Sequence, residues 1–436
     1  MLMLLLPEAA SAVVVWGGNK TDVATGFGGG SGTQADPYQI NTPGQLYYLS
    51  TLTKTNASAT AGQYYVQTED FDLNGSVGTK EYVWQPIGDG DDCFQGHYNG
   101  GGHTIGNIYY KDVSNVGIFG TIATATIDSV TIVGPVGFAN PGKINYCGML
   151  VGRTDKGAMG GTLSHCRNQA SFTITTDKAQ YIGGLVGLGK KLVMHSCSNE
   201  GDITVTTTAS TENDVYVGGL IGSISVASDK LNYSVDSCYN RGHISLECNY
   251  TTDTVTCKRY VGGIIGYDKG NTSSGNMELA FCYSNAMISV TVTGAKYING
   301  MVTLGGLVGY SKGGELRNSY SHTCFSLSNL HPPAKLGCII GEHETSKNHG
   351  WVRNCYYGSS CSCLSQIGST GKTDDEMKSQ DFVDLINTDT EKPFVMDDKD
   401  ENDGFPILYT KCRHRVTIRT NNDAWGTVAK PIKREP

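Results

Sequence analysis

The chain has 436 residues, a formal net charge of −8 and only 17% charged residues, whereas glycine (57 residues) and tyrosine (24) are abundant. No stripe of basic residues could follow a phosphate backbone, so a nucleic-acid partner is not expected. No apolar run is long enough to span a bilayer, and membrane insertion is therefore not expected either.

Residues 1–12 contain a short apolar run that ends in Ala-Ser-Ala. This pattern is typical of the end of a secretory signal peptide cleaved after Ala12, although the positive n-region is missing. We interpret residues 1–12 as a signal-peptide remnant, which predicts a secreted or cell-surface protein; a strand-like or disordered tail is the alternative. Residues 13–35 are glycine-rich and predict a flexible N-terminal segment.

Residues 36–115 are predicted to hold an N-terminal cap and the first coils of a repeat. The segment 42–45, Thr-Pro-Gly-Gln, has the pattern of a capping box with proline in the first helical position. Leucines at 46, 49 and 52 follow it. They predict a short helix that covers the open end of the first coil. The segment 99–102, Asn-Gly-Gly-Gly, predicts a tight turn between two strands.

Residues 116–357 contain a segment of apolar residues and glycine that recurs seven times. Its copies start 31 to 44 residues apart, and self-similarity at such a period predicts a solenoid, a propeller or an array. The copies read VGIFG from Val116, CGMLVG from Cys147, IGGLVG from Ile182, VGGLIG from Val217, VGGIIG from Val261, LGGLVG from Leu304 and LGCIIG from Leu336.

A second element follows five of these copies at a fixed internal spacing. A cysteine, or in one case a serine, precedes an apolar residue by six positions, and the spacer between them has turn composition. Apolar and polar residues then alternate, as in a half-buried strand. The pairs are Cys166 and Phe172, Cys197 and Ile203, Cys238 and Ile244, Cys282 and Ile288, and Ser319 and Phe325.

These features together predict coils of three short strands, stacked as a right-handed parallel β-helix with short capping helices at both ends. A four-stranded propeller blade is the rival, but it usually needs about 40–50 residues per unit. Repeats of 31 and 32 residues are short for a blade. One detail stays open: in a straight strand, Leu220 would lie on the opposite face from Val217 and Ile221. Either a bulge turns such leucines inward or another element covers them.

Five of the 14 cysteines occupy one equivalent position of the repeat, which Ser319 takes once. Serine cannot serve as a thiolate ligand and no CxxC pair accompanies the cysteines, so we prefer a stack of small buried side chains to a metal or redox ladder. A disulfide between Cys248 and Cys257 in the longest insertion is left open. The five equivalent cysteines are Cys166, Cys197, Cys238, Cys282 and Cys355.

Residues 358–411 predict a C-terminal cap. A second capping box at 373–376, Thr-Asp-Asp-Glu, opens a helix that runs to about Ile386, and a last strand spans 404–408. Residues 412–436 then alternate again from Val416, which predicts a truncated β-rich repeat module.

No pattern predicts a catalytic, cofactor-binding or metal-binding residue. His343 and Glu344 resemble the start of a zinc-peptidase motif, but the second histidine is missing. The GxSxG match at 28–32 lacks a strand-to-helix context, and the coil strands are almost free of the carboxylates that a glycoside hydrolase needs. The acidic runs 89–92 and 397–403 predict solvated loops rather than calcium sites.

The glycine-rich copies, with the Cys-x-Asn-x-Gly segments after them, resemble the GLUG repeat of bacterial surface proteins. Residues 30–50 and 372–382 are similar to the start and the usual ending of those proteins, and 416–428 resembles the start of a Listeria–Bacteroides β-grasp repeat. The resemblance implies a secreted or surface-attached bacterial protein, often adhesin-like. In some members the region is the non-catalytic part of an immunoglobulin A1 metallopeptidase.

We therefore expect a non-catalytic β-helix that acts in adhesion to, or presentation toward, a host protein or a polysaccharide. Insertions within 238–261 and 282–304 are the expected contact loops. A carbohydrate-active enzyme on the same scaffold, either a polysaccharide lyase or a glycoside hydrolase, is one alternative, since fold alone does not decide function. A purely structural stalk is the other. The chain is expected to be a monomeric solenoid region of a larger protein.

Overall fold

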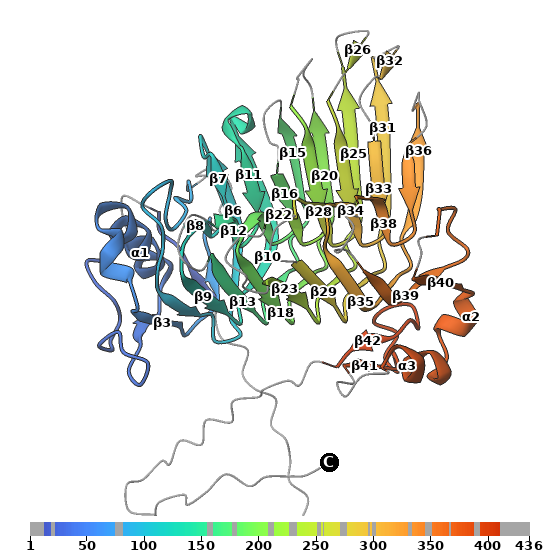
Figure 1. Cartoon of the computed structure of the whole chain (residues 1–436). Coiled ribbons are helices and arrows are strands. Elements are labelled where there is room, and N and C mark those ends of the chain that lie inside the picture. Colours follow the sequence, from blue (N-terminus) through green and yellow to red (C-terminus); the bar gives the residue numbers. More distant parts are fainter. Residues whose placement is uncertain are drawn as a thin grey trace, which may run out of the picture.

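The protein is an elongated stack of parallel strands with helices near both ends (Figure 1). This computed structural model describes residues 13–18, 22–74, 82–154, 160–176, 181–207, 213–225, 233–250, 254–255, 257–270, 277–294, 297–298, 302–329, 334–344, 351–365, 368–387 and 393–409. The predicted signal-peptide remnant and the predicted C-terminal β-rich module lie outside the described residues.

Most coils contain five short strands rather than the three predicted, and the strands of the coils build four sheets. Sheet 1 and sheet 2 have seven strands each. Sheet 1 contains β7 (Asn115–Val116), β11 (Tyr146–Gly148), β16 (Tyr181–Gly183), β21 (Val215–Gly218), β27 (Arg259–Gly262), β33 (Val302–Gly305) and β37 (Lys335–Gly337). Sheet 2 contains β8 (Phe119–Ile122), β12 (Val151–Thr154), β17 (Val186–Lys190), β22 (Ile221–Ser225), β28 (Ile265–Asp268), β34 (Val308–Ser311) and β38 (Ile340–His343).

Sheet 3 is the largest and receives two strands from most coils. Its coil strands are β9 (Ala125–Asp128), β13 (Gly161–Ser164), β14 (Arg167–Asn168), β18 (Leu192–His195), β19 (Ser198–Asn199), β23 (Tyr233–Asp236), β24 (Tyr239–Asn240), β29 (Met277–Ala280), β30 (Tyr283–Ser284), β35 (Glu315–Ser321) and β39 (Val352–Gly358). Its end strands are β1 (Val14–Val15), β2 (Tyr38–Ile40), β3 (Tyr64–Gln67), β4 (Phe71–Asp72), β5 (His97–Asn99), β6 (Thr104–Lys111), β10 (Thr131–Ala139) and β40 (Ser369–Lys372).

Sheet 4 consists of strands that stand upright in Figure 1. It contains β15 (Phe172–Thr176), β20 (Ile203–Thr207), β25 (Ile244–Asn249), β31 (Met287–Thr293) and β36 (Cys324–Ser328). Above it, the short strands β26 (Thr254–Val255) and β32 (Tyr297–Ile298) pair in parallel.

The predicted register is confirmed. The first residues of all seven copies pair with one another, coil by coil, from Val116 to Leu336 in sheet 1. The residues six positions after the cysteines or serine pair in the same way from Phe172 to Phe325 in sheet 4. A parallel ladder across successive coils is a β-helix and not a set of radial blades.

The glycine-rich copies are corners and not single straight strands. In the VGGLIG copy, β21 ends at Gly218 and β22 begins at Ile221, so the chain bends at Gly219 and Leu220. Val217, Leu220 and Ile221 are all 0% exposed, which places the leucine inside with the other two. The bend requires glycine, because a Cβ on Gly219 would lie 2.0 Å from the carbonyl oxygen of Gly263.

The repeat cysteines form the predicted stack of buried side chains. The backbone N–H of Cys166 donates to the sulfur of Cys197 at 3.4 Å, and that of Cys282 donates to Ser319 Oγ at 3.0 Å. Burial raises the pKa of the Cys197 thiol well above its ordinary value. The thiols therefore serve as packed neutral groups, and Cys197 and Cys238 each accept a backbone hydrogen bond from the preceding coil.

Two disulfides that the sequence analysis missed join the last coils to the C-terminal cap. Cys324 is bonded to Cys361 and Cys338 to Cys363. Cys248 and Cys257, for which a disulfide was left open, are both unpaired and buried.

The N-terminal segment was predicted to be flexible, and this is wrong for its described residues. β1 pairs with β4, and Trp16 is 1% exposed, with its ring 5.2 Å from that of Tyr47. Phe27 stacks on Tyr38 at 4.8 Å. These aromatic contacts hold the segment against the first coil.

The predicted helix at 42–45 is present as α1 (Pro43–Thr55), followed by the 3-10 turn η1 (Ala57–Thr60). Of the three leucines in the predicted apolar stripe, Leu46 and Leu49 are buried, whereas Leu52 is only half-buried. Only half of the predicted capping box forms: Thr42 accepts from the N–H of Gln45, whereas the Gln45 side chain accepts from the N–H of Asn41.

The turn predicted at 99–102 does not join a hairpin. It is a corner of a coil, because β5 and β6 pair with strands of other coils and not with each other. A second 3-10 turn, η2 (Pro141–Lys143), follows β10.

The C-terminal cap covers both the open end and one side of the stack. Leu364 bridges Gly337 and β40 pairs with β39 at the end of the last coil, whereas the residues from Met377 onward pack against the outside of sheet 3. Its helix divides into α2 (Asp374–Met377) and α3 (Gln380–Ile386), because Ser379 starts a second N-cap by accepting from the N–H of Phe382. The capping box at Thr373 and Glu376 is confirmed. β41 (Phe394–Val395) and β42 (Ile407–Leu408) pair antiparallel beside α3 (Figure 1). Side chains from this cap pack against Tyr283, Tyr320 and Tyr356 of the coils.

Candidate binding cleft

Two rows of outward-facing side chains run along the corner between sheets 1 and 2. Parallel pairing places four tyrosines of sheet 1 in one row and two tyrosines of sheet 2 in the row beside it. We call these six residues the tyrosine cleft: Tyr146, Tyr181, Tyr216 and Tyr260 on sheet 1, and Tyr267 and Tyr310 on sheet 2.

The two rows touch each other across the corner. The ring of Tyr267 lies 4.8 Å from that of Tyr216 and 5.1 Å from that of Tyr260, and Tyr310 lies 5.2 Å from Tyr260. At the N-terminal end, the guanidinium of Arg153 lies over Tyr146 at 5.3 Å. Contact between the outward-facing rings of both sheets makes the two rows one continuous aromatic surface along this corner.

Within each row, the rings stack on one another. The centroids of Tyr146 and Tyr181, Tyr181 and Tyr216, and Tyr216 and Tyr260 are 5.2, 5.0 and 5.7 Å apart, with interplanar angles of 17°, 20° and 2°. Tyr260 is only 4% exposed, and the other five are half-buried. Neighbouring rings therefore occupy the ring faces, and the cleft presents ring edges and hydroxyl groups.

Carboxylates border the cleft. The Tyr310 hydroxyl donates to Glu344 Oε2 at 2.7 Å, and the Tyr216 hydroxyl donates to Asp214 Oδ2 at 3.5 Å. Burial, reinforced by the negative charge of Asp214, raises the pKa of Tyr216. Burial and the hydrogen bond to Glu344 likewise raise the pKa of Tyr310. The phenols thus stay neutral at physiological pH and can both donate and accept hydrogen bonds.

A cavity of about 330 Å³ lies at the N-terminal end of the same corner. Asn115, which pairs with Tyr146 in sheet 1, lines it together with Asp89 and Trp84. The Asn115 side-chain amide donates to Asp89 Oδ1 at 2.7 Å. The sequence-predicted acidic run 89–92 thus meets the cleft at this end, with Asp89 in a structural hydrogen bond.

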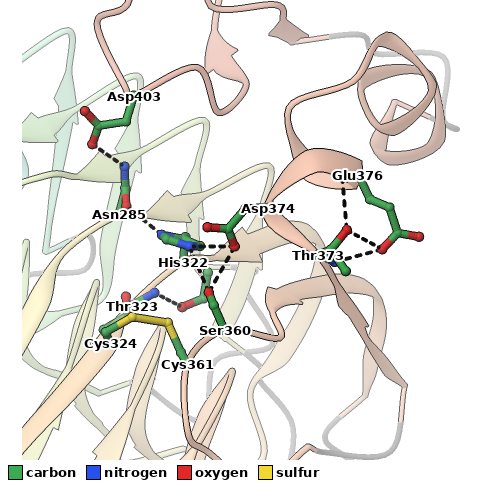
Figure 2. A network of polar contacts seen from close by, with 11 residues as sticks. Asn285, His322, Thr323, Cys324, Ser360, Cys361, Thr373, Asp374, Glu376 and Asp403 are labelled. Carbon is green, nitrogen blue, oxygen red and sulfur yellow. Dashed lines mark hydrogen bonds and ion pairs between the residues drawn. A yellow bond between two sulfur atoms is a disulfide. The ribbon is translucent and has the colours of Figure 1, made fainter.

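A serine, a histidine and an aspartate meet elsewhere, between the coils and the cap (Figure 2). Ser360 Oγ and Asp374 Oδ1 lie 3.4 and 3.2 Å from the same nitrogen, His322 Nε2, and Ser360 donates to Asp374 at 2.9 Å. A catalytic triad needs the acid and the nucleophile on opposite ring nitrogens. The cluster instead joins the cap to the coils beside the Cys324–Cys361 disulfide.

The other sequence candidates are also placed. His343 ends β38 at the C-terminal end of sheet 2, next to Glu344, and the pKa of its imidazole is lowered by burial. In the acidic run 397–403, Asp397 accepts backbone hydrogen bonds from Glu401, Asn402 and Gly404, which order the loop. Among the described residues, no group of three or more His, Cys, Asp or Glu is placed to hold a metal ion.

The insertions expected as contact loops extend sheet 4. β25 and β31 pair over their whole common length, and β26 pairs with β32 beyond them. They rise away from the body of the stack in Figure 1.

The sequence analysis counted tyrosine but did not place it. The signal was present, because tyrosine directly precedes four of the glycine-rich copies, at 146, 181, 216 and 260. In a parallel solenoid, equivalent positions stack, so this recurrence alone predicts a tyrosine row. The second row, at 267 and 310, follows the copies by a constant offset in only two coils.

Comparisons with known proteins were made at the level of sequence and of structure. No family model matches the chain. A segment of 98 residues, 22% of this chain, is 32% identical to a protein of Evansella cellulosilytica named "Putative Gly-rich membrane protein". That match spans 11% of the relative's length. Among the described residues, no helix has the length and hydropathy needed to cross a membrane.

The fold is similar to a crystal structure described as "a putative immunoglobulin A1 protease from Bacteroides ovatus", with a TM-score of 0.50 and 17% identity. The similarity covers 89% of this chain and 98% of that one. At this identity the similarity concerns the fold, and together with the stacked parallel sheets it identifies the chain as a parallel β-helix.

Proposed function

We propose that this chain is a non-catalytic, secreted or cell-surface β-helix that binds a host protein or a glycan through the tyrosine cleft. The observation that carries the proposal is the double row of stacked tyrosines along the corner between sheets 1 and 2. Tyrosine supplies a large contact area and a polar hydroxyl at low conformational cost, which is why it is enriched at binding interfaces.

The scaffold supports this proposal. The cleft residues lie on or directly beside strands of sheets 1 and 2, whose register repeats coil by coil, so the rings are held before any ligand binds. Preorganised side chains lose little freedom on binding. The resemblance to GLUG-repeat surface proteins and the names of the two similar proteins are consistent with an extracellular location, and they remain support by analogy.

The test is a binding screen of the purified chain against glycan arrays and immobilised host extracellular proteins, with a parallel hydrolysis assay. We expect binding that is lost when Tyr181 and Tyr216 are both replaced by alanine. Tyr64→Ala is the matched control, because Tyr64 is also half-buried and stacked, on His97 at 4.2 Å, but lies on sheet 3.

The alternatives predict different results. Release of product from a polysaccharide contradicts the non-catalytic proposal and favours the carbohydrate-active enzyme. Absence of any ligand favours the structural stalk. Binding that survives the double tyrosine replacement moves the interaction to another surface, such as the extended strands of sheet 4.

A further inference from the structure

We infer that the occupant of the tyrosine cleft is an extended polypeptide segment of a partner protein that carries aromatic side chains and a basic residue. This inference rests on the proposed function, because it names the partner class of the same site. The inference is drawn from a second tyrosine ladder in the same molecule, which the C-terminal cap of this chain covers.

The second ladder lies on sheet 3, and we call it the covered ladder: Tyr239, Tyr283, Tyr320 and Tyr356. Its geometry matches that of the cleft. Tyr239 and Tyr283 stack at 4.9 Å with an interplanar angle of 4°, and Tyr283 and Tyr320 stack at 5.1 Å with an angle of 1°. Both faces of the Tyr283 ring are thus occupied by neighbouring rings, as in the middle of the cleft row.

The C-terminal cap supplies aromatic rings to the edges of this ladder. Phe382 of α3 meets Tyr320 and Tyr356 edge-on, at 5.9 and 5.2 Å with angles of 78° and 86°. Phe394 of β41 lies 5.7 Å from Tyr320 and 6.4 Å from Tyr283. Edge-to-face contact is the arrangement that the ring quadrupoles favour when the faces are already taken.

The cap also supplies hydrogen-bond partners for the Tyr320 hydroxyl, one from the backbone and one from a side chain. The Tyr320 hydroxyl donates to the carbonyl oxygen of Pro406 and accepts from the Asn402 side-chain amide at 2.9 Å. A peptide segment thus provides both kinds of contact that a stacked tyrosine ladder leaves open, namely aromatic rings for the edges and backbone carbonyls for the hydroxyls.

The cleft offers the same open groups. Tyr181 lies between Tyr146 and Tyr216, and Tyr216 lies between Tyr181 and Tyr260, so neither ring has a free face. A sugar ring packs on an open aromatic face, and the middle of this row has none. A peptide, in contrast, can insert aromatic side chains against the edges as the cap does on sheet 3.

The charge distribution along the cleft indicates that the partner segment also carries a basic residue. Asp214 accepts hydrogen bonds from the Tyr216 hydroxyl and from the N–H of Lys258, and it forms no ion pair within the described part of the chain. At the C-terminal end the carboxylates are already matched, with Lys335 at 2.6 Å from Glu342 and Lys312 at 3.9 Å from Glu344. A lysine or arginine of the partner is therefore expected beside Asp214, where an opposite charge gains most.

The test is selection from a displayed library of short linear peptides on the wild-type chain, with counter-selection on the Tyr181→Ala, Tyr216→Ala double variant. We expect selected peptides to be enriched in Phe, Tyr or Trp together with Lys or Arg. Affinity of one synthesised peptide should fall about tenfold or more on Tyr216→Ala, as at a central interface anchor. Tyr64→Ala should leave it unchanged.

Asp214→Asn should weaken the same peptide several-fold and reduce the dependence of its affinity on salt. If the Tyr216→Ala variant does not fold, the peptide affinities of the Asp214→Asn and Tyr216→Phe variants test the inference instead. Selected peptides without aromatic residues, or with affinity independent of both positions, overturn the inference.

Neutral oligosaccharides, tested in the same titrations, separate the inference from the proposed function. A glycan that binds in a Tyr216-dependent way while no peptide does overturns the peptide inference and leaves the binding function intact. If neither peptides nor oligosaccharides bind in this assay, and the array screen finds no ligand, both the peptide inference and the proposed binding function are contradicted.

Discussion

The two tyrosine ladders of this protein are built alike and end differently. In both, tyrosines from successive coils stack at about one inter-strand spacing on the outside of a parallel sheet. Tyr283 and Tyr320 of the covered ladder are 1% and 0% exposed beneath the cap, whereas five of the six cleft tyrosines are half-buried.

The difference teaches that a stacked tyrosine row is not by itself a binding site. On sheet 3 it is a part of the core that fastens the C-terminal cap to the coils. On sheets 1 and 2, in contrast, the tyrosine cleft remains at the surface. Of the two ladders, only the cleft can contact a partner. Burial, not residue type, separates the structural role from the functional one.

The largest expected effect is a difference in stability loss between a buried and a half-buried tyrosine, one from each ladder. Tyr320→Ala removes a fully buried ring and the hydroxyl that bonds to Pro406 and Asn402. We expect a loss of about 3–5 kcal/mol in the free energy of unfolding, as for other buried aromatic residues. Tyr181→Ala should cost about 1 kcal/mol, since its ring is half-exposed. Urea unfolding measures both, and equal losses contradict the distinction between the ladders.

The next effect concerns what holds the cap over the covered ladder. Replacing Cys324 and Cys361 together with serine opens a disulfide that spans 37 residues. We expect a loss of about 2–4 kcal/mol in stability. Ligand binding at the cleft should be unchanged, because the disulfide lies at the cap. Thermal unfolding with and without reductant checks the first part, and a reduced affinity at the cleft argues against the second.

Glu200 anchors the first rung of the covered ladder. It accepts from the Tyr239 hydroxyl at 2.6 Å and lies 3.0 Å from Arg241. Burial acts to raise the pKa of Glu200, but the hydrogen bonds from Tyr239 and Gln169 and the charges of Arg167 and Arg241 outweigh it, so the pKa is lowered.

A lowered folded-state pKa contributes stability that is present above the ordinary glutamate pKa and is lost as pH falls through the folded value. Glu200→Gln should therefore cost about 1–3 kcal/mol at neutral pH, with a smaller difference from wild type near pH 3. Denaturant unfolding across this pH range tests it. A constant difference at all pH values means that the carboxylate charge is not the cause.

The smallest effect sharpens the functional side of the comparison. Tyr216→Phe removes a hydroxyl whose bond to Asp214 is long, at 3.5 Å, and keeps the stacked ring. We expect stability within about 0.5 kcal/mol of wild type. If the hydroxyl contacts a ligand, affinity should fall while stability does not. A parallel loss of stability would mean that the hydroxyl mainly supports the fold.

Much of the architecture followed from the sequence. A solenoid repeats its contacts at a fixed offset, so equivalent positions found by spacing alone, such as Cys197 and Cys238, also meet in space. The helix starts at Thr42 and Thr373 were readable for a local reason, because a cap is made by residues three positions apart.

The corners and cross-links were not readable in this way. The bend at Gly219 needs glycine because a Cβ there would meet Gly263 and Asn240, which are distant in the sequence. The partners of Cys324 and Cys338 depend on how the cap folds back, and sequence spacing does not specify such pairings.

The sequence by itself thus determined the repeat, its register and the parallel β-helix, because these depend on local alternation and on like residues stacking over like. Only the tertiary structure decided which tyrosine ladder is covered and which is open. That choice depends on where the C-terminal cap, whose packing residues run from Met377 to Leu408, folds back onto the coils. Such long-range packing is not encoded in the period of the repeat.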